Sequence, residues 1–305
     1  MHWRRLGHVY VARGERAWAA SHAYVPTAMM LDGDTIRVYV AFRDQAGVGR
    51  VGYVDVDAGD PLKVLEVSAD PVLDIGEPGM FDDNGVTPLS ICPTDDGMRL
   101  YYFGWQLGVH VRYFLFAGLA ISEDGGETFR RHARVPVLDR SDSEPLIRSG
   151  CCVLQRGGRW EMWYAAGSRF IDVGGKKRPT YDLRHLVSDD GIGWGDTGEP
   201  CMTFASEDEY GFGRPYVVED RGRLRMWYTI RTASKGVRLG YAESDEGRVW
   251  KRMDDQVGLD VAVDGWDSEM VGFACVQETR HGTYMFYNGN GFGETGFGVA
   301  VADDA

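Results

Sequence analysis

The sequence predicts an all-β fold, a five-bladed β-propeller with four antiparallel strands per blade. Three observations predict it. A short aromatic strand motif recurs five times, its copies are almost evenly spaced, and each copy lies among further strand-like segments separated by turns. The 41 glycines against 11 prolines fit a fold with many tight turns. Sustained helical periodicity is absent from the sequence.

The recurring strand motif sets the number of blades. Its copies read IRVYVAF, RLYYFG, EMWYAAG, RMWYTIR and YMFYNGN. Anchored on Val40, Tyr102, Tyr164, Tyr228 and Tyr287, they are separated by 62, 62, 64 and 59 residues (102−40, 164−102, 228−164, 287−228). Dividing the 305 residues by five gives 61, so the period accounts for the whole chain.

Further strand-like segments flank each copy of the motif. An apolar run precedes it, a third strand follows in most copies, and three of these third strands end in a turn and an aromatic residue that lead to a fourth strand. Four strands in a repeat of this length are typical of propeller blades arranged around a channel. A pair of β-sandwiches or a solenoid fits less well, because sandwiches lack such a period and solenoid repeats are shorter.

The repeat predicts a single domain over residues 1–305. The expected blades are approximately 20–75, 76–140, 141–205, 206–262 and 263–305. Residues 1–19 are expected to add an outer strand to the last blade and so close the ring.

Composition limits the partners. A net charge of −13 and a pI near 5.0 argue against a nucleic-acid binder and favour an uncharged or cationic ligand. The N-terminus lacks the apolar core of a signal peptide, and no run approaches 18 apolar residues, so we expect a soluble cytoplasmic protein without a membrane partner. Five cysteines without CxxC spacing indicate neither a zinc site nor a full disulfide framework and predict reduced thiols. No metal and no cofactor are predicted. The oligomeric state is left open.

Carboxylates recur at one phase of the repeat. Segments 16 to 20 residues upstream of the anchors meet at one mouth of the predicted channel, and in four of the five blades they contain an acidic residue. Burying several like charges together is unfavourable unless one is protonated or paired. Glycoside hydrolysis requires two carboxyl groups astride the scissile bond, and Asp83 and Glu269 are our candidates. The alternative is that these acids cap tight turns.

Other residues of the same rim are predicted to contact a ligand or to assist catalysis. His22 is a third catalytic candidate, with a buried structural imidazole as the alternative. Arginine forks bind carboxylates and aromatic rings stack on sugars, although ion pairing and core packing are the alternatives for each. The predicted substrate-binding residues are Asp82, Asp267, Arg43, Arg148, Arg214, Arg231, Glu209, Trp105, Tyr24 and Trp266.

Several stretches of the sequence resemble a known group of proteins. They are SHAYVPT (21–27), GMFDDNGVTP (79–88), LYYFGW (100–105), GLAISEDGG (118–126), GRPYVVE (213–219), GWDSEMVG (265–272) and MFYNGNGFGETGFG (285–298). Together they resemble the five-bladed propeller glycosidases of glycoside hydrolase families 43, 32, 68 and 130. The sequence looks most similar to uncharacterised glycosidase-like proteins of bacterial glycan gene clusters.

The resemblance implies a carbohydrate-active enzyme that cleaves or transfers a glycosidic bond in an axial pocket, with a small carbohydrate or glycoside as its partner. In the better-known hydrolases an aspartate entering blade one is the general base, whereas this chain has Ser21 and His22 there. A base at Asp82 or Asp83 is therefore one alternative. Others are a non-hydrolytic protein that binds a sugar or a nucleotide sugar, and a propeller that serves another step of a biosynthetic pathway.

Overall fold

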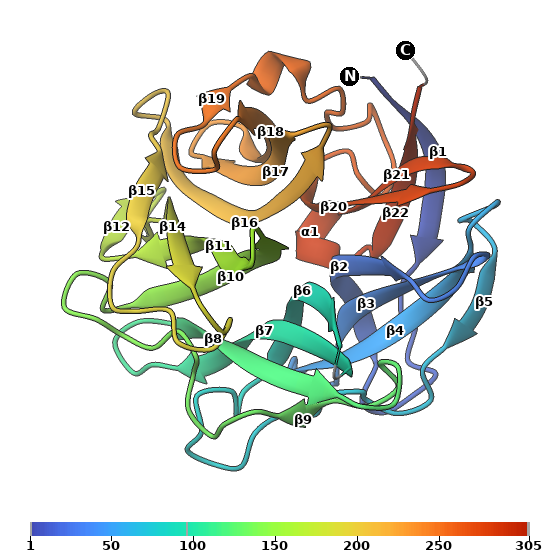
Figure 1. Ribbon diagram of the computed structural model, residues 1–305, viewed down its shortest axis with the longest axis horizontal. Coiled ribbons are helices and arrows are strands. Elements are labelled where there is room, and N and C mark those ends of the chain that lie inside the picture. The colour runs from blue at the N-terminus through green and yellow to red at the C-terminus, as the bar shows by residue number, and fades with distance from the viewer. Residues whose placement is uncertain (1, 96, 304–305) are drawn as a thin grey trace.

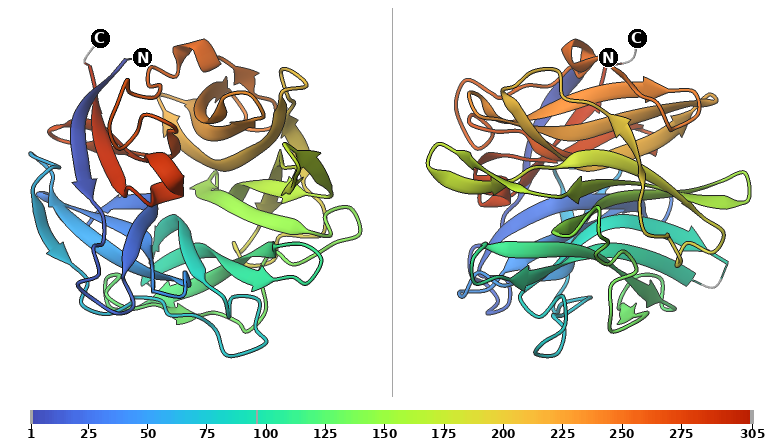
Figure 2. Two further views of the ribbon diagram at one scale, coloured as in Figure 1. Left: turned by 180° about the vertical axis from the view of Figure 1, so that it is seen from behind. Right: turned by 90° about the vertical axis from the view of Figure 1, so that its left-hand side faces the viewer.

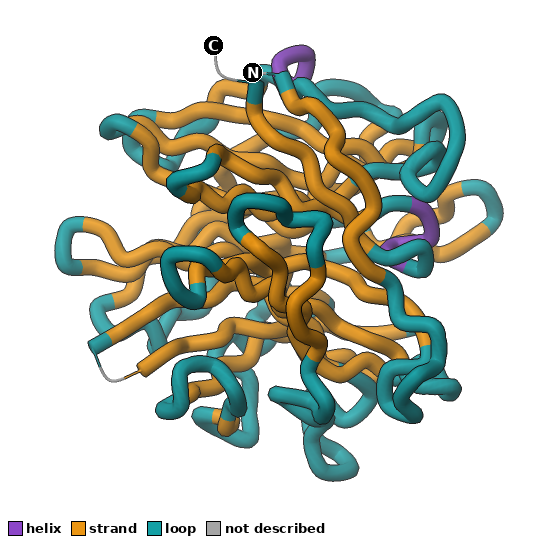
Figure 3. The backbone as a smooth tube through the Cα atoms, turned by 90° about the vertical axis from the view of Figure 1, so that its right-hand side faces the viewer, coloured by secondary structure: helices purple, strands orange, loops and turns teal. Residues whose placement is uncertain are grey.

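The computed structural model describes residues 2–95 and 97–303, and strands dominate it (Figure 3). Within these ranges the helical elements are a single 3₁₀ turn, η1 (Asp254–Gln256), and one short helix, α1 (Asn290–Gly293). The chain is therefore nearly all β.

The strands form five antiparallel groups of four, which we call units 1 to 5, and a short parallel pairing joins units 2 and 3 into one eight-stranded sheet. Unit 1 contains β2 (Ser21–Met30), β3 (Thr35–Arg43), β4 (Gly49–Asp57) and β5 (Val64–Val67). Unit 2 contains β6 (Val86–Thr94), β7 (Gly97–Leu107), β8 (Tyr113–Ser122) and β9 (Arg130–Arg131). Unit 3 contains β10 (Ile147–Arg156), β11 (Arg159–Gly167), β14 (Asp182–Ser188) and β15 (Glu199–Met202).

The last two units complete the set. Unit 4 contains β16 (Glu209–Asp220), β17 (Arg223–Thr232), β18 (Gly236–Ser244) and β19 (Lys251–Arg252). Unit 5 contains β20 (Gly272–Thr279), β21 (Gly282–Asn288), β22 (Phe297–Ala302) and, from the other end of the chain, β1 (Trp3–Tyr10). A separate hairpin of β12 (Phe170–Val173) and β13 (Lys176–Pro179) lies between β11 and β14 in the sequence.

The units surround a common centre (Figures 1 and 2). The first strand of each unit contacts the first strands of two others: β2 contacts β6, β6 contacts β10, β10 contacts β16, β16 contacts β20, and β20 contacts β2 again. Strand β1 pairs with β22 at the outer edge of unit 5, so the two ends of the chain share one sheet. The five anchor residues of the sequence motif all lie in the second strands, β3, β7, β11, β17 and β21, where they are buried.

Each first strand is irregular at the same place. The pairing register shifts once in β6, β10 and β20, and twice in β2 and β16. Such bulges bend a strand and turn its backbone groups away from the ladder. Val25 and Phe273 have φ angles of 55° at these places, in the left-handed region that side chains other than glycine rarely adopt. The bulges therefore free backbone carbonyls near the axis.

Candidate functional site

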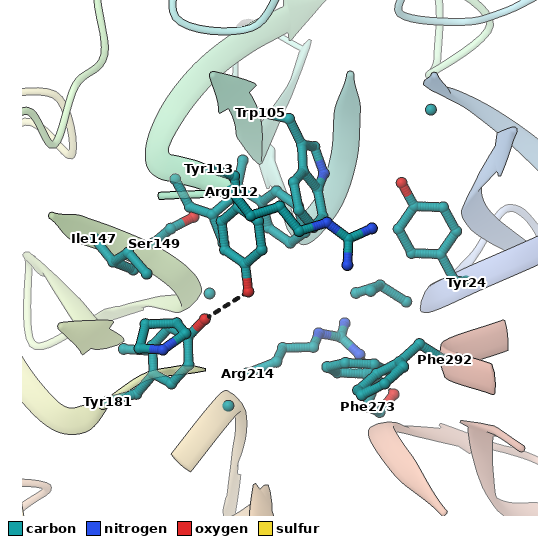
Figure 4. A pocket seen from close by; sticks show the side chains of 18 of the residues that line it. Tyr24, Trp105, Arg112, Tyr113, Ile147, Ser149, Tyr181, Arg214, Phe273 and Phe292 are labelled. Carbon is teal, nitrogen blue, oxygen red and sulfur yellow. Dashed lines mark hydrogen bonds between the residues drawn. The ribbon is translucent and has the colours of Figure 1, made fainter. Parts of the chain in front are cut away.

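The five units enclose an axial pocket, a cavity of about 470 Å³ (Figure 4). Residues of all five units line it, and most of its apolar wall is aromatic. The aromatic residues are Tyr24, Phe103, Trp105, Tyr113, Phe170, Tyr181, Phe212, Phe273 and Phe292. The hydroxyls of Tyr113 and Tyr181 lie 3.2 Å apart across units 2 and 3. This size lies within the range of small-molecule sites, which are about 300–1,000 Å³.

Arg214 contributes a buried cation to the wall of this pocket. It belongs to the bulge of β16, its exposed fraction is 2%, and its guanidinium reaches the bulges of three other units. It donates to the carbonyls of Pro26, Leu89, Phe273 and Ala274 and to the Thr27 hydroxyl at 2.8–3.1 Å. A single side chain thus ties units 1, 2 and 5 to unit 4 through otherwise free carbonyls.

The charged residues that line the axial pocket are all basic. They are Arg43, Arg112, Lys177, Arg178, Arg214 and Arg231, and no aspartate or glutamate of the described chain lines it. The acidic net charge of the protein therefore does not extend to the residues that line this cavity.

The structure brings five of the predicted site residues together in this pocket: Tyr24, Arg43, Trp105, Arg214 and Arg231. Arg43 lies over the Tyr24 ring with 4.9 Å between the guanidinium carbon and the ring centroid. Trp105 makes edge contacts with Phe103 and Tyr113, and its indole N–H donates to the Thr87 hydroxyl. The tryptophan is therefore held in one orientation with part of its surface in the cavity.

The predicted catalytic pair lies outside the lining. The Asp83 carboxylate accepts a hydrogen bond from the Gly79 amide at 2.9 Å, and the next residue, Asn84, lines the pocket. Glu269 is exposed, and its backbone amide donates to Asn290 at 2.8 Å. The repeat period predicts that both carboxylates lie near the rim of the channel. In the structure neither of them lines the cavity.

A tyrosine–carboxylate–arginine network accounts for the recurring acids. In units 2, 3 and 5 the anchor tyrosine donates to the carboxylate 20 positions upstream, as in Tyr102 to Asp82 at 2.9 Å. An arginine on an outer strand then binds the same carboxylate, as Arg131 does to Asp82 at 2.8 Å. The matching groups are Glu144, Tyr164 and Arg184 in unit 3, and Asp267, Tyr287 and Arg5 in unit 5.

Unit 4 builds a variant of this network. Tyr228 donates to Asp254, and Arg252 binds both Asp254 and the predicted site residue Glu209. Burial, together with the neighbouring carboxylates, raises the pKa values of the four tyrosines, so they remain hydrogen-bond donors at neutral pH. The network links the second strand of each of these units to its outer strands.

Unit 1 is the unit without an acidic residue at this phase of the repeat. Its anchor is Val40, which has no hydroxyl, and the position 20 residues upstream is Ala20. The carboxylate is thus missing where the tyrosine is missing. Asp82, Glu209 and Asp267 are thus members of this network, and none of them lines the axial pocket.

Three other predicted residues also lie away from the lining. Arg148 is buried and donates to Glu144 at 2.6 Å. Trp266 packs on Tyr287 with 5.1 Å between ring centroids. His22 lies beside the pocket, where its ring nitrogens contact the Ser21 hydroxyl at 2.9 Å and the Arg43 guanidinium at 3.3 Å.

The protonation of His22 follows from its surroundings. Burial, and secondarily the positive charge of Arg43, lower the pKa of His22 to about 4. The imidazole is therefore neutral at physiological pH, and its Nε2 atom can accept a hydrogen bond from Arg43.

Sequence reasoning missed several lining residues that lie outside the regular repeat. Arg112 and Tyr113 come from the turn between β7 and β8 and the start of β8, while Lys177 and Arg178 belong to the inserted β12–β13 hairpin. Phe292 belongs to α1, within the segment GNGFGETGFG (289–298). The 64-residue spacing between the third and fourth anchors (228−164) is the one signal of the inserted hairpin.

The part of the chain that the structure describes contains no group of three or more His, Cys, Asp or Glu residues arranged to hold a metal ion. All five cysteines are buried and unpaired. None of the described helices has the length and apolar character needed to cross a bilayer.

Comparison with solved structures defines the class of fold. A glycoside hydrolase superposes with a TM-score of 0.77 at 16% identity, over 98% of this chain and 90% of that one. A thermostable family-43 glycoside hydrolase gives 0.69 at 14% identity, over 92% and 88% of the two chains. A structure from work on GH130 enzymes that target β-1,2 mannosidic linkages gives 0.71 at 14% identity, over 99% and 93%. The chain has the β-propeller fold of glycoside hydrolase-like proteins.

Sequence comparison identifies a narrower group. No protein-family model matches the chain. It is 37% identical over 304 residues to Uncharacterized protein Rv1502 of Mycobacterium tuberculosis strain H37Rv, covering 100% of both chains. Uncharacterized protein MT1551 of strain CDC 1551 matches at the same identity and coverage. The chain belongs to the family of these mycobacterial proteins.

Proposed function

We propose that this protein is a carbohydrate-active protein that binds a saccharide in the axial pocket of a five-bladed propeller. In this proposal the five units are the blades of one domain over residues 1–305. The observation that carries the proposal is the convergence of aromatic side chains from all five units on one cavity of saccharide size. Sugars present apolar C–H faces to aromatic rings and hydroxyls to the few polar groups between them, and a pocket of this composition suits both.

Trp105→Ala is expected to weaken saccharide binding about three- to ten-fold, because an aromatic contact contributes roughly 0.5–1.5 kcal/mol beyond its buried area. Titration calorimetry with the tightest-binding member of a saccharide panel measures this loss. Trp18→Ala is the matched control, because Trp18 is half-buried in the first part of the chain and does not line the pocket. Equal affinities for wild type and Trp105→Ala would exclude the aromatic wall from binding.

A second candidate function is cleavage or transfer of a glycosidic bond, with Asp83 and Glu269 as the base or nucleophile and the acid. The fold shared with glycoside hydrolases favours it. Asp83 precedes the lining residue Asn84, and Glu269 is hydrogen-bonded to Asn290, which precedes the lining residues Gly291 and Phe292. Ligand binding would have to bring the two carboxyl groups to the scissile bond.

Turnover separates the two candidates. If the pair is catalytic, Glu269→Gln and Asp83→Asn are each expected to lower turnover of an aryl glycoside by about 10²–10⁴ while binding is retained. Asp264→Asn serves as the control, because Asp264 is an exposed acid five positions from Glu269. Undiminished turnover in Glu269→Gln would remove this residue from catalysis. Binding without any turnover across an aryl glycoside panel would leave saccharide binding as the function.

A further inference from the structure

The sign of charge in the axial pocket is opposite to that of the whole protein. The chain has 46 acidic and 33 basic residues, yet six basic and no acidic residues of the described chain line the cavity. Cations gathered in a partly enclosed, low-dielectric cavity create a positive potential that raises the local concentration of anions. The lining of the pocket is therefore positively charged, although the net charge of the whole protein is negative.

The basic residues of the pocket also lack acidic partners. Arginines elsewhere in the fold are neutralised, as in Arg131 with Asp82 at 2.8 Å, Arg252 with Glu209 at 2.7 Å and the buried pair Arg37 and Asp55 at 2.8 Å. Within the described residues, none of the six lysines and arginines that line the cavity forms an ion pair with a carboxylate. Their charge is left for a ligand.

Arg231 shows the lack of partners most clearly. Its guanidinium lies between two rings, 5.2 Å from the Tyr181 centroid and 5.4 Å from the Phe292 centroid. Its Nε atom is buried and has no hydrogen-bond partner. A buried donor without an acceptor is destabilising, and an anionic acceptor in the pocket would relieve that cost. The guanidinium therefore lies against two aromatic rings while its Nε atom lacks an acceptor.

Further cations reach the same cavity from units 1, 2 and 4. Arg43 occupies the place in unit 1 that Arg231 occupies in unit 4, three residues after the anchor (43−40, 231−228), and it too lies over an aromatic ring. Arg214 is almost fully buried and bound only to neutral groups, and its Nε atom also lacks a partner. The guanidinium of Arg112 points into the space between Trp105 and Tyr24 (Figure 4).

We infer that the axial pocket recognises an anionic saccharide, one that carries a phosphate or a carboxylate, and that Arg231, Arg43 and Arg112 bind the anionic group. This inference rests on the proposed saccharide-binding function and specifies its ligand class. Planar guanidinium groups bind phosphate and carboxylate oxygens through paired charge-assisted hydrogen bonds, whereas a neutral sugar would leave the cluster uncompensated.

Matched ligands test the charge requirement. Binding of glucose, glucuronate, glucose 6-phosphate and inorganic phosphate is measured by titration calorimetry and thermal shift, at low and at high salt. At least one anionic sugar is expected to bind ten-fold or more tightly than glucose, with an affinity that falls as salt screens the charges. The glucuronate and glucose 6-phosphate arms distinguish a carboxylate from a phosphate.

Variants then locate the anionic group. Arg231→Gln is expected to weaken anionic sugar binding about ten-fold or more, since a hydrogen bond to a charged group contributes roughly 1.5–3 kcal/mol. Arg112→Gln is expected to have an effect of the same size, and it changes an exposed residue without disturbing the core. Binding of glucose should change little. Arg159→Gln is the control, because it removes the same charge from an exposed residue outside the pocket.

The outcomes distinguish a failure of the anionic-ligand inference from a failure of the proposed saccharide-binding function. Glucose binding as tight as either anionic sugar, or anionic sugar binding that Arg231→Gln and Arg112→Gln both leave unchanged, would overturn the inference and keep saccharide binding. Phosphate binding as tight as that of both anionic sugars would overturn the saccharide proposal and keep the anion site. No binding of any probe would overturn both.

Discussion

Replacing Arg214 by methionine is expected to lower the free energy of unfolding by about 3–5 kcal/mol. The guanidinium is the donor for four backbone carbonyls and one hydroxyl contributed by units 1, 2 and 5. Methionine fills part of the volume but donates nothing, so these bulge carbonyls lose their partners inside the fold. Because the contacts join distant parts of the chain, the loss should appear in global unfolding.

Urea denaturation followed by tryptophan fluorescence measures the effect. Arg159→Met is the control, because Arg159 is exposed and pairs only with the exposed Asp189, so its replacement should change stability by less than about 0.5 kcal/mol. Arg214→Lys should recover only part of the loss, since one ammonium group cannot reach all five acceptors. A stability of Arg214→Met within 1 kcal/mol of wild type would show that the axial contacts contribute little.

Replacing Glu144 by glutamine is the second change with a large expected effect, again about 3–5 kcal/mol of lost stability. Glu144 is 1% exposed and accepts hydrogen bonds from Tyr164, Arg148, Arg184 and the Gly198 amide. Glutamine keeps the shape but removes the negative charge, which leaves the buried Arg148 without a counterion. Removing one partner of a buried ion pair is costly because the other charge remains desolvated.

Thermal and urea denaturation of Glu144→Gln give this value. Glu199→Gln is the control within the same unit, because Glu199 is exposed on β15. The structural account also predicts that saccharide affinity per folded molecule stays near that of wild type. Full stability combined with lost binding would instead assign this carboxylate to the ligand site.

The fold was predictable because the pattern that encodes it is local and repeated. Each second strand carries a run of aromatic and β-branched residues around its anchor, and the five runs recur at nearly equal spacing. The all-β fold predicted from these runs and the glycoside hydrolase-like propeller implied by the resemblance are confirmed by the similar solved structures. The β12–β13 hairpin departs from the repeat, and its one signal in the sequence was the 64-residue spacing between the third and fourth anchors.

The site was harder to predict, because the period shows which residues are equivalent but not where their side chains point. Asp82 and Asp267 share one phase of the repeat because each binds the tyrosine 20 positions later inside its own unit. In unit 1 Val40 replaces the tyrosine and Ala20 replaces the carboxylate, and this joint absence indicated that role. Arg43 and Arg231 were found from their common offset, whereas Arg112 lies in the turn between β7 and β8, outside the strand motif that was used to align the units.

The most direct test of the account is a crystal structure with the tightest-binding saccharide of the glucose, glucuronate and glucose 6-phosphate set. The account predicts the sugar ring in the axial pocket against Trp105 and Tyr24, with its anionic group within hydrogen-bond reach of Arg231, Arg43 or Arg112. A saccharide bound outside this cavity, with the pocket free of sugar, would contradict the central claim.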